Sequence, residues 1–220
     1  MNIIFETLFD ILYLCFAIGM GLYLLRQKSD KIVKLYGIMS IVLGLGDAFH
    51  LVPRIIALNT TGLISYAPVL GFGKAVTSIT MTIFYLILYK IYIIYYKDEN
   101  KKLTKILYIL AAIRILLCLL PQNKWLLYNQ PLEFSIYRNI PFTIMGIIII
   151  YIFYKKSYLK DIFKTMYIAI FLSFAFYIPV VLFADKYPLV GMLMMPKTVA
   201  YAYIVFLGYK YFKNIENNNI

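Results

Sequence analysis

Residues 33–58 read VKLYGIMSIVLGLGDAFHLVPRIIAL, one apolar run that carries an acid, a histidine and an arginine towards its end. The run exceeds the ~20 helical residues that cross a bilayer. At about 100° per residue, Asp47, His50 and Arg54 share one helix face. Ionisable groups cost ~2.5–3.5 kcal/mol each at the centre of a membrane helix, so they usually face inward and serve a function. A buried structural ion pair between helices is the alternative interpretation.

The composition of the whole chain also indicates a membrane protein. Of 220 residues, 63% are hydrophobic and 15% are charged, whereas soluble domains are roughly 45–50% apolar. The net charge of +12 lies in short segments between apolar runs, so we expect the lipid bilayer as a partner and no nucleic acid. The first run follows no basic region and contains Glu6 and Asp10, so we expect a retained span rather than a cleaved signal.

Seven apolar runs predict an all-α fold, a single domain over 1–220 that forms a bundle of seven transmembrane helices. The spans are expected at about 3–25, 33–58, 64–89, 103–120, 132–154, 162–184 and 189–210. Two stretches that open spans resemble each other, since 68–77 and 188–200 each begin with proline, carry glycine three residues later and then contain a lysine. This similarity predicts repeats at 1–97 and 132–213, joined by the helix at 103–120, a layout found in carriers with midplane binding sites.

The basic residues of the connections fall on alternate sides of the predicted spans. Those after the first, third, fifth and seventh spans are Arg26, Lys28, Lys31, Lys34, Lys97, Lys101, Lys102, Lys105, Lys155, Lys156, Lys160, Lys164, Lys210 and Lys213. The other connections carry only Lys124 and Lys186. The positive-inside rule therefore predicts an outer N-terminus and a cytoplasmic C-terminus. We expect the protein in the plasma membrane of a bacterium.

Ionisable residues within the spans lie towards the predicted outer side, whereas the cytoplasmic halves contain only apolar and hydroxyl side chains. The bases are Arg54, Lys74, Arg114, Arg138 and Lys197, and the deeper acids are Asp10, Asp47 and Glu133. This distribution predicts a water-filled cavity open to the outside. Its surplus of bases favours a small anionic ligand or a lipid headgroup. The expected binding residues are Asp47, His50, Arg54, Lys74, Arg114, Arg138, Lys197 and Tyr201.

The pattern Gly46-Asp47-Ala48-x-x-Leu51-x-Pro53-Arg54 resembles the Gly-Asp helix motif of the lysoplasmalogenase-like (YhhN) membrane family. Proteins of that family are polytopic and of similar size. The resemblance implies hydrolysis of the vinyl-ether bond of lysoplasmalogens, with intramembrane aspartates as acid and base groups. It would make Asp47 the catalytic residue.

Three functional hypotheses follow. The first is a carrier or receptor for a small anion, and the second is the lipid hydrolase that uses Asp47. The third is a retinal-type photoreceptor, because Lys197 lies in the seventh span, where opsins form a Schiff base. A metal site is not expected, since the chain has one histidine, and Cys15 and Cys118 lie singly within spans. No cofactor is expected under the first two hypotheses.

Overall fold

The structure, a computed structural model, describes residues 3–184 and 186–218, and every regular element in these ranges is helical. The long helices are α1 (Ile3–Arg26), α2 (Lys31–Leu58), α3 (Ala67–Tyr96), α4 (Lys101–Leu119), α5 (Leu132–Lys156), α6 (Met166–Phe183) and α7 (Met194–Asn218). Short 3-10 helices are η1 (Pro121–Asn123), η2 (Ser157–Leu159) and η3 (Pro188–Leu193). The predicted all-helical fold is confirmed.

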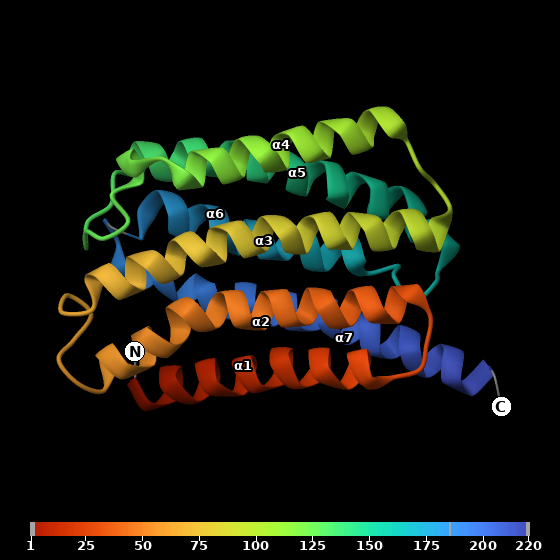
Figure 1. Ribbon diagram of the computed structural model, residues 1–220, viewed down its shortest axis with the longest axis horizontal. Helices are drawn as coiled ribbons and strands as arrows, with labels where there is room; N and C mark the ends of the chain where they lie inside the picture. Colours follow the sequence, from red (N-terminus) through yellow and green to blue (C-terminus); the bar gives the residue numbers. More distant parts are fainter. Residues whose placement is uncertain (1–2, 185, 219–220) are drawn as a thin grey trace.

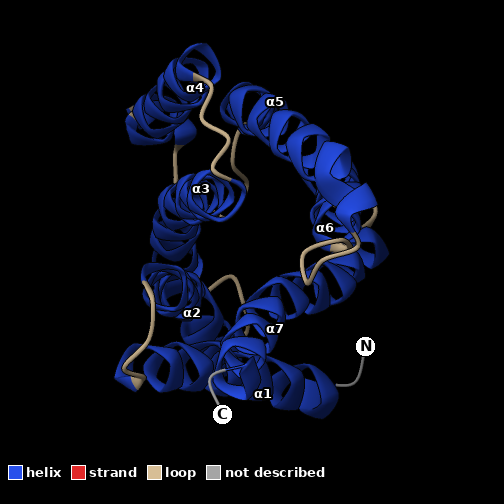
Figure 2. Cartoon of the chain, turned by 90° about the vertical axis from the view of Figure 1, so that its right-hand side faces the viewer, coloured by secondary structure: helices blue, strands red, loops and turns tan. Residues whose placement is uncertain are grey.

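The long helices run up and down along one common direction (Figure 1). Each packs against the next helix in the chain, and α7 also packs against α1, so the bundle closes into a ring. Figure 2 shows this ring from the end that holds the C-terminus. Contacts of α7 with α2 and of α5 with α3 reach across the ring.

Six of the helices described are long and apolar enough to cross a membrane: α1, α2, α3, α5 with its η2 extension, α6, and α7 with η3. This confirms the prediction of a multi-pass membrane protein. The helix α4 is not among the six, because it carries three lysines in its first turns and Arg114 further on. A crossing by α4, and with it the predicted count of seven spans, stays a prediction.

Aromatic side chains pack together at one end of the bundle. The C-terminus lies at that same end (Figure 1). The rings of Tyr95 and Phe163 are 4.7 Å apart between centroids, and Phe163 also stacks on Tyr36 and Tyr211. The helix α3 ends at Tyr96, whereas the predicted span ended at about residue 89. Tyr95 takes part in this packing, which stabilises the additional turns of the helix. Lys90 therefore lies within the helix, exposed on its surface, and the prediction that this half holds only apolar and hydroxyl groups is wrong at this position.

Side-chain caps fix the helix starts at that end. The carboxylate of Asp30 accepts a hydrogen bond from the backbone N–H of Val33 at 2.9 Å, and the side chain of Asn100 accepts from Lys102 and Leu103. Such caps satisfy N–H groups that the first turn of a helix leaves unpaired. Free space inside the bundle is found at the opposite end.

Candidate functional site

Two adjoining cavities of about 220 and 490 Å³ open at the end of the bundle opposite the aromatic packing. We call the first the arginine lobe, because Arg114 and Arg138 line it, and the second the carboxylate lobe, because Glu6, Asp10 and Asp47 line it. Together they form the chamber. Their common lining residues are His50, Lys74, Thr77, Val180, Ala184, Met194 and Lys197.

All eight residues that the sequence singled out line this chamber. Asp47 and Arg54 line the carboxylate lobe. Arg114, Arg138 and Tyr201 line the arginine lobe. His50, Lys74 and Lys197 line both. The structure thus brings side chains from α2, α3, α4, α5 and α7 into one space, whereas their role in binding stays a prediction.

Arg114 is the most deeply buried charge of the chamber, with 2% of its surface exposed. Its guanidinium carbon lies 3.2 Å from the centroid of the Phe142 ring. Nε and Nη1 have no hydrogen-bond partner among the described residues. Burying polar groups without partners is costly, and more so when they are charged. The side chain therefore holds two buried donors without acceptors at the wall of the arginine lobe.

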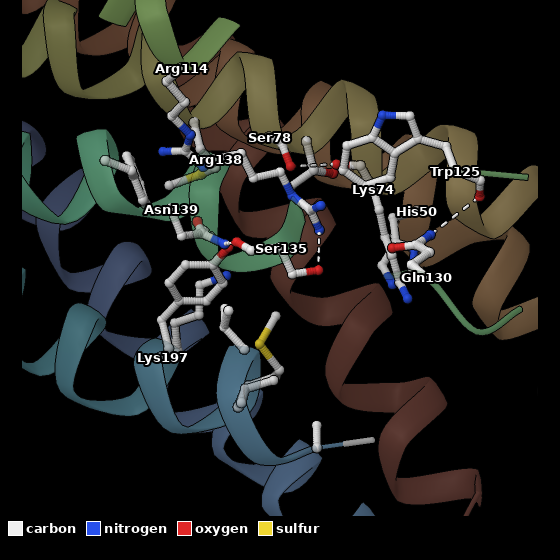
Figure 3. A pocket seen from close by; sticks show the side chains of 18 of the residues that line it. His50, Lys74, Ser78, Arg114, Trp125, Gln130, Ser135, Arg138, Asn139 and Lys197 are labelled. Atoms are coloured by element: carbon white, nitrogen blue, oxygen red, sulfur yellow. Dashed lines mark hydrogen bonds between the residues drawn. The ribbon is translucent and has the colours of Figure 1, made fainter. Parts of the chain in front are cut away.

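Arg138 is held in place by the segment that connects α4 to α5 (Figure 3). Its Nη1 donates to Asn123 Oδ1 at 2.9 Å, its Nη2 donates to Ser135 Oγ at 3.0 Å, and its guanidinium carbon is 4.3 Å from the Trp125 ring. The Asn123 amide also donates to the carbonyls of Leu117 and Leu120 and so closes the end of α4. The connection thereby fixes the orientation of one wall of the arginine lobe.

Lys197 lies between the two lobes and is 7% exposed. Its Nζ is 4.9 Å from the Tyr177 ring centroid and 5.2 Å from that of Tyr201. No carboxylate of the described residues lies within 4.0 Å of this nitrogen. Tyr177 in turn donates its hydroxyl to Asn139 Oδ1 at 2.9 Å. The ammonium group is thus stabilised by aromatic faces rather than by an ion pair, and retinal attachment there stays a prediction.

The acids of the carboxylate lobe differ in their partners. Glu6 Oε1 accepts from Arg54 Nε at 2.7 Å and also from Nη2, which joins α1 to α2. Asp47 Oδ2 accepts from the Tyr13 hydroxyl at 2.6 Å. Asp10 is 7% exposed, and its Oδ2 has no hydrogen-bond partner among the described residues. In the described part of the chain, no group of three His, Cys, Asp or Glu side chains is arranged to hold a metal ion.

His50 fixes the approach of α2 to α3. Its Nδ1 lies 3.1 Å from the carbonyl oxygen of Leu70, and since a carbonyl only accepts, Nδ1 carries the hydrogen. Thr77 adds a second link, because its Oγ1 donates to the Gly46 carbonyl at 2.9 Å. Both side chains line both lobes, so they hold the wall between α2 and α3.

The prediction that Glu133 lines the cavity is wrong. Glu133 was expected there, but it is exposed in the first turn of α5 and lines neither lobe. It precedes Arg138 by five residues, which places the two about 140° apart around the helix, so only Arg138 faces the chamber. Glu6 takes its place as the third acid. Its signal was the face that Glu6 shares with Asp10 and Tyr13 at helical spacing.

An apolar groove of about 260 Å³ adjoins the arginine lobe between α5 and α6. It shares Asn139, Tyr177 and Val181 with that lobe. Its other lining residues are Ile136, Ile140, Thr143, Ile144, Ile178 and Leu182. The groove therefore connects the polar chamber with the outer surface of two membrane helices.

No protein-family model matches this chain, and no curated protein or solved structure matches it either. A functional assignment therefore depends on the chemistry of the chamber itself. Among the described residues, four cationic side chains and no acid line the arginine lobe, whereas three carboxylates and three cationic side chains line the carboxylate lobe.

Proposed function

We propose that this protein binds a small anionic ligand, a carboxylate, a phosphate or a lipid headgroup, in the arginine lobe, as a carrier or receptor. The observation that supports this most directly is Arg114, a buried guanidinium whose Nε and Nη1 lack acceptors among the described residues. Guanidinium groups bind carboxylate and phosphate oxygens through paired N–H donors. Lys74, Arg138 and Lys197 add positive charge around the same space.

The proposal includes seven membrane crossings, with the chamber at the extracellular end and the bacterial plasma membrane as the location. The 19 residues of α4 extend ~28 Å at 1.5 Å per residue, close to the ~30 Å of a bilayer core. The connections at the chamber end carry only Lys124 and Lys186, whereas those at the other end carry the remaining loop lysines. This asymmetry supports an outer chamber and a cytoplasmic C-terminus.

The test measures anion binding to the purified protein in nanodiscs by calorimetry. The anions are acetate, ethyl phosphate and glycerol 3-phosphate. We expect at least one of these anions to bind, and Arg114→Gln to weaken its binding tenfold or more. The matched control is Arg26→Gln, which removes an exposed arginine from the far end of α1. Absence of binding by all three anions, or equal affinities of Arg114→Gln and wild type, would overturn the proposal.

A second candidate is hydrolysis of lysoplasmalogens, the activity that the resemblance to the YhhN family implies. One observation favours it: Asp47 and Asp10 line the same lobe, with Asp47 held by the Tyr13 hydroxyl. In such a reaction one carboxyl group protonates the vinyl carbon and the other takes a proton from water as it attacks. The resulting hemiacetal breaks its bond to the glycerol oxygen, which takes up a proton, and the products are a fatty aldehyde and a glycerophosphodiester.

Its test is the aldehyde released from lysoplasmalogen by purified protein. Loss of aldehyde in Asp47→Asn, with retention in Glu133→Gln, would support hydrolysis, because Glu133 is exposed outside the chamber. Aldehyde release that persists in Asp47→Asn would exclude the proposed acid–base role.

A further inference from the structure

The described acids that line the chamber all lie in one of its two lobes. Among the described residues, no Asp or Glu lines the arginine lobe, whereas Glu6, Asp10 and Asp47 line the carboxylate lobe. Lys74 and Lys197 line both lobes and so lie along the passage between them. The chamber is therefore cationic at one end and rich in carboxylates at the other.

Within the carboxylate lobe, Asp10 is the acid whose bonding is incomplete. Glu6 is paired with Arg54, and Asp47 accepts from Tyr13. Asp10 has 93% of its surface buried, yet its Oδ2 finds no donor among the described residues, and its side chain lines the lobe. A carboxylate in this position lacks a donor, and an ammonium group supplies three.

Within the arginine lobe, the corresponding residue is Arg114. Arg138 donates to Asn123 and Ser135, so two of its donors are already used. Arg114 keeps two nitrogen atoms without acceptors and is nearly fully buried. The chamber therefore has an unused donor group in one lobe and an unused acceptor in the other.

We propose that the ligand is a zwitterion that places its anionic group on Arg114 and its ammonium group towards Asp10. This inference rests on the proposed function, since it assigns a second charge to the same ligand. The two lobes adjoin and share seven lining residues, so one ligand can place a charged group in each lobe. A plain anion leaves Asp10 Oδ2 without a donor, whereas the ammonium group of a zwitterion supplies one.

The test compares probes that differ only in the ammonium group, measured by calorimetry on the full chain in nanodiscs. Phosphoethanolamine is compared with ethyl phosphate, and β-alanine with propionate. We expect the zwitterion of at least one pair to bind wild type tenfold or more tightly than its plain anion. Asp10→Asn should remove this advantage, whereas Arg114→Gln should weaken the binding of both the zwitterion and the plain anion.

The controls separate this inference from the proposed function. Glu133→Gln removes an exposed acid outside the chamber and should preserve the advantage of the zwitterion. The wild-type comparison needs no variant, so a misfolded Asp10→Asn protein leaves the test intact. Plain anions that bind as tightly as zwitterions in every pair of probes, free or lipid, would overturn the zwitterion inference alone. Failure of every anion to bind would overturn the proposed function as well.

A lipid headgroup and a free zwitterion share this chemistry, and a third pair of probes distinguishes them. Lysophosphatidylethanolamine and lysophosphatidic acid differ by the ammonium-bearing group but both carry an acyl chain. Tighter binding of lysophosphatidylethanolamine than of lysophosphatidic acid, without a difference in affinity within the pairs of free compounds, supports a lipid ligand. Its acyl chain would lie in the α5–α6 groove. Advantages in the free pairs support a soluble zwitterion. No advantage in any pair overturns the inference.

Discussion

Gly71 is the residue on which the covering of the arginine lobe depends most directly. A Cβ at this position would lie 1.5 Å from the carbonyl oxygen of Trp125, a backbone atom that no rotamer change can move. We expect Gly71→Ala to displace the α4–α5 connection, to lower the stability by ~1–3 kcal/mol, and to weaken anion binding, because Trp125 stacks on Arg138. Thermal unfolding and calorimetry in detergent measure both effects.

The matched control is Gly19→Ala in α1, where an added Cβ has no neighbour within 4 Å. It should leave both readouts unchanged or raise stability slightly, since alanine favours helix more than glycine. Equal unfolding temperatures for the two variants would show that the connection does not depend on the close approach at Gly71.

At the residue scale, helical spacing within α2 correctly predicted which of its ionisable side chains face the chamber. Asp47, His50 and Arg54 share one face of α2, and all three line the carboxylate lobe. Spacing within one helix cannot reveal partners on another. The Glu6–Arg54 pair and the Tyr13–Asp47 hydrogen bond each join α1 to α2 across more than thirty residues, so neither could be inferred. Contacts of this kind place Glu6, rather than the predicted Glu133, as the third acid of the carboxylate lobe.

At the scale of elements, an ion pair ties the α3–α4 connection to the end of α5. Lys156 Nζ lies 2.7 Å from Asp98 Oδ2, and this hydrogen bond, helped by the Tyr92 hydroxyl, lowers the pKa of Asp98 below its ordinary 3.8. A lowered carboxyl pKa means that the pair stabilises the fold above pH 3.8. The contribution is lost as the pH falls through the folded-state pKa.

Asp98→Asn should therefore lower stability at neutral pH, by no more than ~1 kcal/mol, because the pair is partly exposed. The difference from wild type should shrink below pH 3.8, and added salt should also reduce it. Unfolding temperatures across pH 3–8 measure the effect. The neighbouring Glu99→Gln is the control, and a difference that grows on acidification would contradict the assignment.

The existence of the helices was predictable, since each apolar run became one long helix, but their ends were less so. The helix α6 begins at Met166 rather than at residue 162, because Asp161 accepts from the N–H of Phe163 and holds a turn there. The extension of α3 to Tyr96 depends on rings from other parts of the chain. Contacts of this kind lie outside any window of sequence. The predicted internal repeat stays a prediction.

At the scale of the whole molecule, the function depends on whether α4 crosses the membrane. If it does, the α4–α5 connection that covers the arginine lobe lies on the same side as the α2–α3 connection (Figure 1). In a chain with Cys15→Ala and Cys118→Ala, we expect Asn129→Cys and Ser65→Cys to react with a membrane-impermeant maleimide on intact cells. We expect Glu99→Cys to react only after permeabilisation. All three positions are exposed.

The comparison of Asn129→Cys with Glu99→Cys decides the matter, because α4 is the only long helix of the described chain between them. Labelling of both from the same side would mean that α4 lies along the membrane, and Arg114 would then have to reach the chamber from its surface. Labelling from opposite sides places the guanidinium at depth, where an unpaired charge costs most. An anionic ligand at Arg114 stabilises the protein most in that arrangement.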